Sequence, residues 1–147
     1  MVPGVEPGPS MTRAERGAAD EVPPTSSPAI RTIAMPTDTN PAGDIFGGWL
    51  MAQMDLAAGN AAARRARGRC ATVAVDEMTF HQPVLVGDEV SFYASVERVG
   101  RTSMTIRVEA WRRSRDADEV GRVTGATFTF VAIGPDRRPR EIPPESL

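Results

Sequence analysis

Residues 47–67 read GGWLMAQMDLAAGNAAARRAR and form the only long stretch of the chain with helical periodicity. Its apolar side chains recur at intervals of four, three and four positions, at Leu50, Met54, Ala57 and Ala61. The alanine-rich second half has high helix propensity. Arginines near its end complement the negative end of the helix dipole, and Gly68 can end the helix. At a rise of 1.5 Å per residue, this helix would be about 30 Å long.

Beyond this helix the apolar period changes to two, which is typical of strands with one buried face. The segments concerned are 71–80, 90–97, 103–111 and 124–133, and a short strand is expected at 30–35 before Pro36. Turn residues separate these segments at 86–88, 99–101 and 114–118. The short turns predict that consecutive strands pair antiparallel.

One apolar helix and one half-apolar antiparallel sheet have a single efficient packing. The helix lies across the sheet, and the sheet curls around it. The sequence therefore predicts an α+β protein with a single hotdog domain, an antiparallel sheet wrapped around one long central helix.

The prolines set the expected domain boundaries. Six of the 13 fall in residues 1–28 and four in 135–147, which leaves three for the 106 residues between. We expect a disordered N-terminal extension at 1–28, the hotdog domain at 29–134, and a solvated C-terminal tail at 135–147. A domain of this size has little volume for a deep active site of its own.

Charge and composition exclude several classes of function. Seventeen basic and 19 acidic residues give a net charge of −2, so no global basic field for nucleic acid is expected. Every basic residue is Arg, which excludes a catalytic lysine. The single Cys70 and single His81 exclude a disulfide within the chain and a histidine cluster, and a cytoplasmic location fits. The apolar stretch 45–63 contains Asp55, so no membrane span is expected.

The loop before the helix carries the densest chemical signal. Asp44 precedes two glycines, Gly47 and Gly48, that open the helix. Free N–H groups in a first helical turn can receive a carbonyl oxygen and act as an oxyanion hole. Asp44 beside them could activate a water molecule or attack the carbonyl carbon directly. The alternative, which spacing alone favours, is that Asp44 only caps the helix and the glycines only allow close packing.

The longer segment resembles the YciA-type acyl-CoA thioesterases. The likeness rests on MPTDTN at 35–40 and GDIFGGWLMAQMD at 43–55, followed in family order by VAVD at 73–76, MTF at 78–80, PV at 83–84, VGD at 86–88, VGRTS at 99–103 and FTFVA at 128–132. It covers about residues 30–143 and is specific, well beyond one short motif.

This resemblance implies hydrolysis of fatty acyl-CoA to free acid and coenzyme A, with no metal or redox cofactor. It makes Asp44 the essential carboxylate, acting as base or nucleophile, and Gly47 and Gly48 the source of backbone donors. Asn40 would help to position water or the carbonyl. Coenzyme A phosphates would rest on a turn comprising Gly100, Arg101, Thr102 and Ser103, since a guanidinium binds phosphate in bidentate fashion.

Four other residues receive simpler interpretations. Asp55 is expected as a buried acid with a structural or dimer-contact role, because a buried carboxylate needs a partner. His81 is expected at the surface or a sheet edge. Met51 and Met54 can line an acyl tunnel, although methionines at helical spacing are more often core residues.

The resemblance also implies assembly. Related chains form dimers whose sheets join edge to edge, often assembled further into trimers of dimers, with Asp44 and the Arg101 turn supplied by different subunits. Two rival functions remain open. One is a hotdog hydratase or dehydratase, which needs a His beside an acid, whereas His81 is far in sequence from Asp44. The other is a non-catalytic acyl-CoA-binding or regulatory domain.

Overall fold

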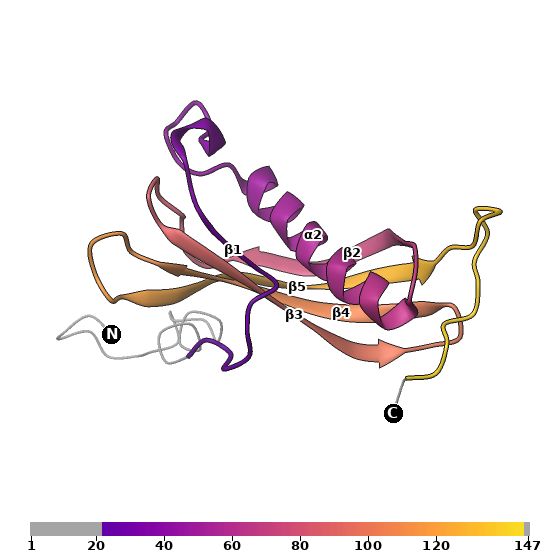
Figure 1. Cartoon of the computed structure of the whole chain (residues 1–147). Coiled ribbons are helices and arrows are strands. Elements are labelled where there is room, and N and C mark those ends of the chain that lie inside the picture. The colour runs from indigo at the N-terminus through magenta and orange to yellow at the C-terminus, as the bar shows by residue number, and fades with distance from the viewer. Residues whose placement is uncertain (1–21, 146–147) are drawn as a thin grey trace, which may run out of the picture.

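The computed structural model describes residues 22–145 (Figure 1). Along the chain it contains β1 (Ile30–Ile33), a 3₁₀ turn η1 (Pro36–Asp38), α2 (Gly47–Ala66), β2 (Cys70–Phe80), β3 (Glu89–Val99), β4 (Ser103–Arg113) and β5 (Val120–Ala132). These bounds confirm the expected long helix and the five strands. Most of the expected N-terminal extension, residues 1–21, lies outside the described residues. No helix among the described residues is long and apolar enough to span a membrane.

The five strands form one antiparallel sheet in the order β1-β3-β4-β5-β2. The predicted hairpins β3–β4 and β4–β5 are confirmed. The expected pairing of β2 with β3 is wrong, because β2 pairs with β5 at the opposite edge. The connecting segment 81–88 is too long for a tight hairpin turn, and it crosses the end of the sheet to reach β3.

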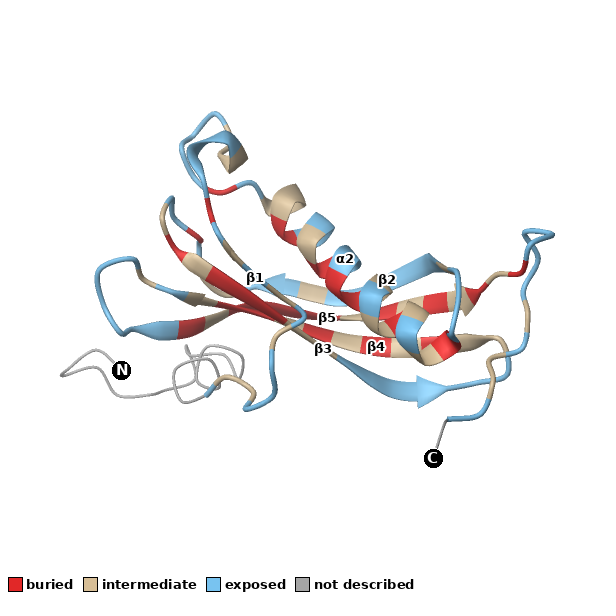
Figure 2. Ribbon diagram, viewed as in Figure 1, coloured by how far each residue is buried: buried red, intermediate tan, exposed pale blue. Residues whose placement is uncertain are grey.

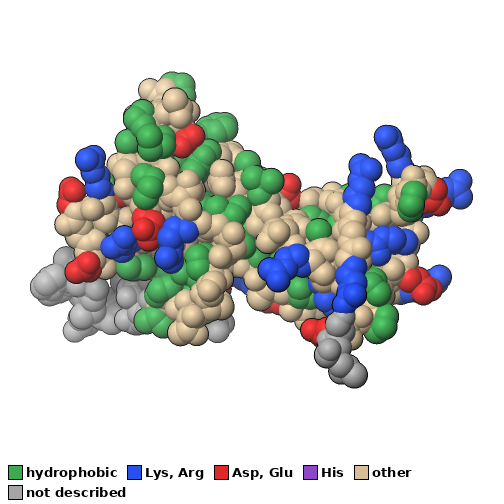
Figure 3. Space-filling model, in the orientation of Figure 1, with side chains coloured by type: hydrophobic (Ala, Val, Ile, Leu, Met, Phe, Trp, Pro, Cys, Tyr) green, Lys and Arg blue, Asp and Glu red, His purple; other side chains and the backbone are tan. Residues whose placement is uncertain are grey.

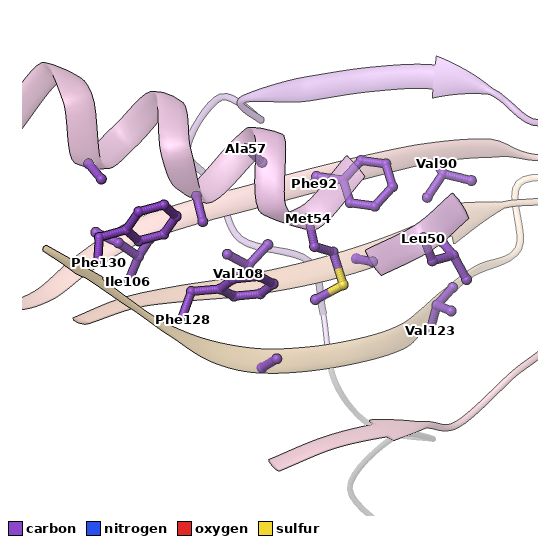
Figure 4. Packing of buried hydrophobic residues seen from close by; sticks show 14 of the residues in the cluster. Leu50, Met54, Ala57, Val90, Phe92, Ile106, Val108, Val123, Phe128 and Phe130 are labelled. Atoms are coloured by element: carbon purple, nitrogen blue, oxygen red, sulfur yellow. The ribbon is translucent and has the colours of Figure 1, made fainter. Parts of the chain in front are cut away.

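Helix α2 lies across the concave face of the sheet (Figure 1), as a hotdog fold requires. Its buried side chains are Leu50, Met54, Ala57, Ala58, Ala62 and Ala66. Alternate residues of the strands meet them, among them Phe92, Ile106, Val108, Phe128 and Phe130 (Figure 4). The small alanines bring the second half of the helix close to the sheet. The fold prediction is therefore confirmed, and Met54 is a core residue with no exposed surface.

The helix ends at Ala66, and its C-cap is Arg67 and not Gly68. Arg67 adopts the left-handed conformation at φ 53°, and its N–H donates to Ala63 O. Gly68 serves a different purpose, since a Cβ there would lie 2.6 Å from Nη2 of Arg140. Glycine at this position thus leaves room for an arginine from the C-terminal segment.

The C-terminal segment packs against the domain. Arg140 N donates to Ala132 O at 2.9 Å, and Ile142 N donates to Arg101 O at 2.9 Å. Arg65 on α2 donates from Nη1 to Pro143 O at 2.7 Å. The expectation of a solvated tail is therefore wrong for residues 140–143, because Arg140 and Ile142 donate to backbone carbonyls at the end of the sheet and Pro143 accepts from a side chain of α2.

Strand β2 is the exposed edge of the sheet (Figure 2). Most of its residues are exposed, including Val73 at 57% and Phe80 at 46%. On the nearby outer face of α2, Met51 and Leu56 are also exposed. An edge strand with one side open and apolar side chains around it is a template for pairing with another chain.

Candidate active site

The side chain of Asn40 organises the loop that carries Asp44. Its Oδ1 accepts hydrogen bonds from the N–H of Ala42 at 3.0 Å and of Asp44 at 3.1 Å. The backbone N–H of Asn40 donates in return to Asp44 O at 2.7 Å. Gly43 completes the turn at φ +91°, where a side chain would be strained. Asn40 and Asp44 are thus brought together, with Asn40 in a structural role inside this loop.

The amides of Gly47 and Gly48 are available at the start of α2. The N-cap is Phe46, and no side chain caps the helix. The simple alternative in which Asp44 caps the helix is therefore wrong. Among residues 22–145, neither glycine N–H donates to an acceptor, whereas those of Trp49 and Leu50 donate to Phe46 O. Two backbone donors at the positive end of the helix dipole are free to receive an oxygen.

Two aromatic rings border this pair of glycines. A Cβ on Gly48 would lie 2.6 Å from Cε1 of Phe46, and one on Gly47 would lie 3.9 Å from Cζ of Phe80. An open hollow of about 320 Å³ begins here, and its lining consists of Ile45, Gly47, Leu50, Phe80, His81, Gln82, Pro83 and Val84. The glycine amides therefore lie beside a mainly apolar hollow, which suits the carbonyl end of an acyl group.

His81 is half-buried in this hollow. Its backbone N–H donates to Val123 O at 2.7 Å, which fixes the chain where β2 ends. The separation in sequence between His81 and the Asp44 loop is therefore not a separation in space, because Ile45 and Gly47 line the same hollow. Residues 81–84 form one wall of the hollow. The sequence did not predict their part in the site, although Pro83 directly after a strand indicates a turn there.

Two aspartates offer exposed carboxylates. That of Asp44 has no hydrogen-bond or ion-pair partner among the described residues. Asp55, on the outer face of α2, is exposed and not buried as expected. Its Oδ1 accepts a hydrogen bond of 2.6 Å from Thr72 Oγ1 on β2. The apolar neighbours that suggested burial, such as Leu56, are themselves exposed on a face that none of residues 22–145 covers.

The expected coenzyme A turn joins β3 to β4. Gly100 N donates to Ser103 O at 2.7 Å, and Thr102 O accepts from Ala132 N at 2.8 Å. Arg101 is 81% exposed and pairs with Glu141, with Nε 3.1 Å from Oε1. Figure 3 shows further arginine side chains gathered at this end of the molecule.

This turn and the Asp44 loop lie at opposite ends of the sheet. The loop follows the end of β1, where Ile33 pairs with Glu89 at the start of β3. The turn follows Val99 at the other end of β3. A strand of 11 residues spans about 36 Å, so one protomer cannot bring the two together.

Other reactive groups do not form a second centre. Within residues 22–145, no group of three or more His, Cys, Asp and Glu side chains is placed to hold a metal ion. Burial raises the pKa of the Cys70 thiol, and Arg140 opposes that shift. A thiol with a raised pKa is a poor nucleophile at neutral pH.

Comparison with known proteins identifies the family. The family model described as "Thioesterase superfamily" matches residues 42–117, from the Asp44 loop into the segment after β4. The chain belongs to the thioesterase superfamily. Within it, a Zymomonas mobilis protein named as an uncharacterized acyl-CoA thioester hydrolase is 57% identical over 82% of this chain and 81% of its own. The acyl-CoA thioester hydrolase YciA of Escherichia coli K12 is 45% identical over 83% of this chain and 95% of its own.

Solved thioesterase structures share the fold. A hexameric thioesterase of Yersinia pestis is 46% identical with a TM-score of 0.78, covering 83% of this chain and 99% of its own. An acyl-CoA hydrolase of Staphylococcus aureus, solved with butyryl coenzyme A and coenzyme A, is 28% identical with a TM-score of 0.72. The match covers 78% of this chain and 70% of the Staphylococcus chain. Alanine variants of the Staphylococcus enzyme have been solved at an aspartate and at an asparagine fifteen positions before it.

Proposed function

We propose that this member of the thioesterase superfamily hydrolyses fatty acyl-CoA thioesters to free acid and coenzyme A. The observation that carries the proposal is the pair of free amides of Gly47 and Gly48 beside an apolar hollow. Relatives at 57% and 45% identity bear the name acyl-CoA thioester hydrolase. The proposal includes a cytoplasmic location and a reaction without a metal or redox cofactor.

The amides would stabilise the reaction's developing charge. When water adds to the carbon of the thioester carbonyl, the carbonyl oxygen becomes negative. The donors at the helix N-terminus bind this oxyanion more strongly than the neutral carbonyl. The acyl chain would lie in the hollow lined by Leu50, Phe80 and Val84. A carboxylate is still required to take the proton of the attacking water, or to attack the carbonyl itself.

We propose Asp55 as that carboxylate, ahead of Asp44. The chain contains two asparagines, and only Asn40 is followed by an aspartate fifteen positions later, at Asp55. This is the spacing of the two positions varied in the Staphylococcus enzyme. The hydrogen bond from Thr72 to Oδ1 orients the Asp55 carboxylate and leaves its second oxygen available to water. Asp44 is the second candidate, because it lies closest in the chain to the free amides.

The choice of Asp55 requires two protomers. At a rise of 1.5 Å per residue, Asp55 lies about 12 Å along the helix axis from Gly47, too far to act on a carbonyl held there. We propose that a second copy pairs along β2 and brings its own Asp55 to these amides. The exposed edge strand and its apolar border support this pairing, and related structures are hexameric. A protein that light scattering shows to be a monomer and that still hydrolyses acyl-CoA would contradict this pairing.

The same assembly would join the Arg101 turn of one subunit to the Asp44 loop of another. We propose that Arg101 binds the coenzyme A phosphates, exchanging its exposed partner Glu141 for a doubly charged group. Arg101→Met should raise the KM for acyl-CoA about tenfold and leave kcat nearly unchanged, because a charge-assisted bond contributes about 1.5 kcal/mol or more. Steady-state kinetics measure this, with Arg137→Met as a control from the same end of the molecule. An unchanged KM would remove Arg101 from the site.

The direct test of the activity is thiol release from acyl-CoA substrates of increasing chain length, followed with a thiol reagent. We expect turnover that persists after dialysis against EDTA and depends on chain length, because the hollow accommodates a limited acyl length. If the protein binds acyl-CoA but releases no thiol from any substrate, it is a non-catalytic binding domain.

A further inference from the structure

Arg112 occupies an unusual place on β4. It continues the row of Met104, Ile106, Val108 and Ala110, whose side chains are buried beneath α2. The Arg112 side chain is only 14% exposed, and its Nε donates to Oδ2 of Asp88 at 2.8 Å. The Asp88 side chain is 4% exposed. A charged pair so deeply placed costs desolvation energy, and hydrophobic residues of the same size are often equally stable.

The guanidinium of Arg112 holds more than its ion-pair partner. Nη1 donates to Oε1 of Gln82 at 3.1 Å, and Nη2 donates to Oγ of Ser114 at 3.2 Å. Asp88 Oδ2 also accepts from Leu85 N at 2.9 Å. The planar fork of one arginine thus connects both ends of the 82–88 segment to the end of β4.

The first three residues of this segment belong to the 81–84 wall of the hollow beside Gly47. Gln82, Pro83 and Val84 line it, and Val84 O accepts a hydrogen bond of 3.2 Å from Ile45 N in the loop before α2. The chain of contacts therefore runs from Arg112 through Gln82 and Asp88 to the wall, and through Val84 to the start of the helix.

We propose that Arg112 is a positioning residue that fixes the 81–84 wall of the hollow and so determines which acyl groups fit against the glycine amides. The proposal rests on the proposed function, because the hollow is taken as the acyl site. Arg112 touches no reacting atom. It acts through Gln82, whose side chain also lies against Gly121 of β5 and is confined from that side.

The variant Arg112→Lys separates the ion pair with Asp88 from the positioning of the 81–84 wall. A lysine can still neutralise Asp88 as a point charge, but it lacks the fork that reaches Gln82 and Ser114 at the same time. We expect a melting temperature close to that of the parent. We expect kcat/KM to fall roughly tenfold to a hundredfold on the best substrate, with a changed ratio between long and short acyl chains, because small misplacements near the reacting group are costly.

Two further variants make the test specific. Gln82→Met keeps the ion pair intact, removes the acceptor for Nη1 and leaves a side chain of similar length in the lining of the hollow, so it should reproduce the altered chain-length ratio without loss of stability. Arg113→Lys is the matched control: Arg113 lies on the same strand and pairs with Glu89, with Nη2 3.0 Å from Oε2, but is 49% exposed. It should keep the parent's chain-length profile and its kcat/KM within about twofold, since exposed ion pairs contribute little.

Hydrogen exchange provides a readout that is independent of activity. The non-proline amides of residues 82–86, above all that of Leu85, which donates to Asp88 Oδ2, should exchange faster in Arg112→Lys than in the parent, while those of residues 106–110 should not. If the parent hydrolyses acyl-CoA and both Arg112→Lys and Gln82→Met keep its chain-length profile, the positioning role is wrong. If the parent hydrolyses no acyl-CoA, the proposed function fails instead, and unchanged exchange at 82–86 would still overturn the role of Arg112 in holding the wall.

Discussion

Asp55→Asn should lower kcat for acyl-CoA hydrolysis by about 10²–10⁴-fold, the usual contribution of a positioned acid or base. Asparagine has the same shape as aspartate and can still accept the hydrogen bond from Thr72, which measures 2.6 Å in the parent. The fold, the helix and the assembly should therefore be retained, while the proton acceptor is lost. Steady-state kinetics with a thiol reagent measure the effect, and binding of a non-hydrolysable analogue should be nearly unchanged.

The paired variant Asp44→Asn decides between the two carboxylates. Asp44 is held in its loop by backbone bonds to Asn40, so removing its charge should leave that loop intact and reduce kcat less than about tenfold. Asp76→Asn, an exposed carboxylate on β2, controls for loss of charge near the interface. A hundredfold loss in Asp44→Asn together with an active Asp55→Asn would assign the chemistry to Asp44.

The fold could be predicted because its signals are local. The period of two in 103–111 and 124–133 marks the residues that the structure buries, and the stripe at Leu50, Met54 and Ala57 marks the helix face that covers them. The pairing of β2 could not be predicted in this way. It depends on which edge of the sheet the chain joins after α2 has crossed the sheet, and short turn signals carry no such information.

The candidate site was predictable only in part, because it is not local. The sequence places Gly47 and Gly48 at a helix start, and the structure shows their amides free. Asp55 was misjudged because apolar neighbours usually indicate burial, whereas here they indicate a face left open for another chain. His81 lies at the edge of the sheet, as expected, but its nearness to the Asp44 loop was not foreseen, because β2 carries the chain back to the start of α2.

Arg112 did leave a signal in the sequence. It stands at the position where the alternation of buried residues along β4 calls for another apolar side chain. A charged residue in such a row needs a buried partner, and Asp88 lies more than 20 positions away. Its partner could not be identified from the pattern, because that requires knowing that the 82–88 segment crosses the end of β4.

The central claim is that each site is built from two copies of the chain, with Asp55 from one and the Asn40 loop and glycine amides from the other. Asp55→Asn removes the proposed base, and Asn40→Ala removes the acceptor that holds the loop before α2. Each variant should therefore be nearly inactive alone. In a mixed pair of these subunits, one site carries both defects and the other carries none.

Mixing the two variants under conditions of subunit exchange tests this claim most directly. Random pairing should restore about one quarter of the parent's activity per protomer, because half of the pairs are mixed and half of their sites are intact. Mass spectrometry verifies the exchange, and a mixture of Asp55→Asn with Asp55→Ala should recover nothing. The account predicts recovery close to a quarter. A mixture that exchanges fully and remains as inactive as its components would contradict it.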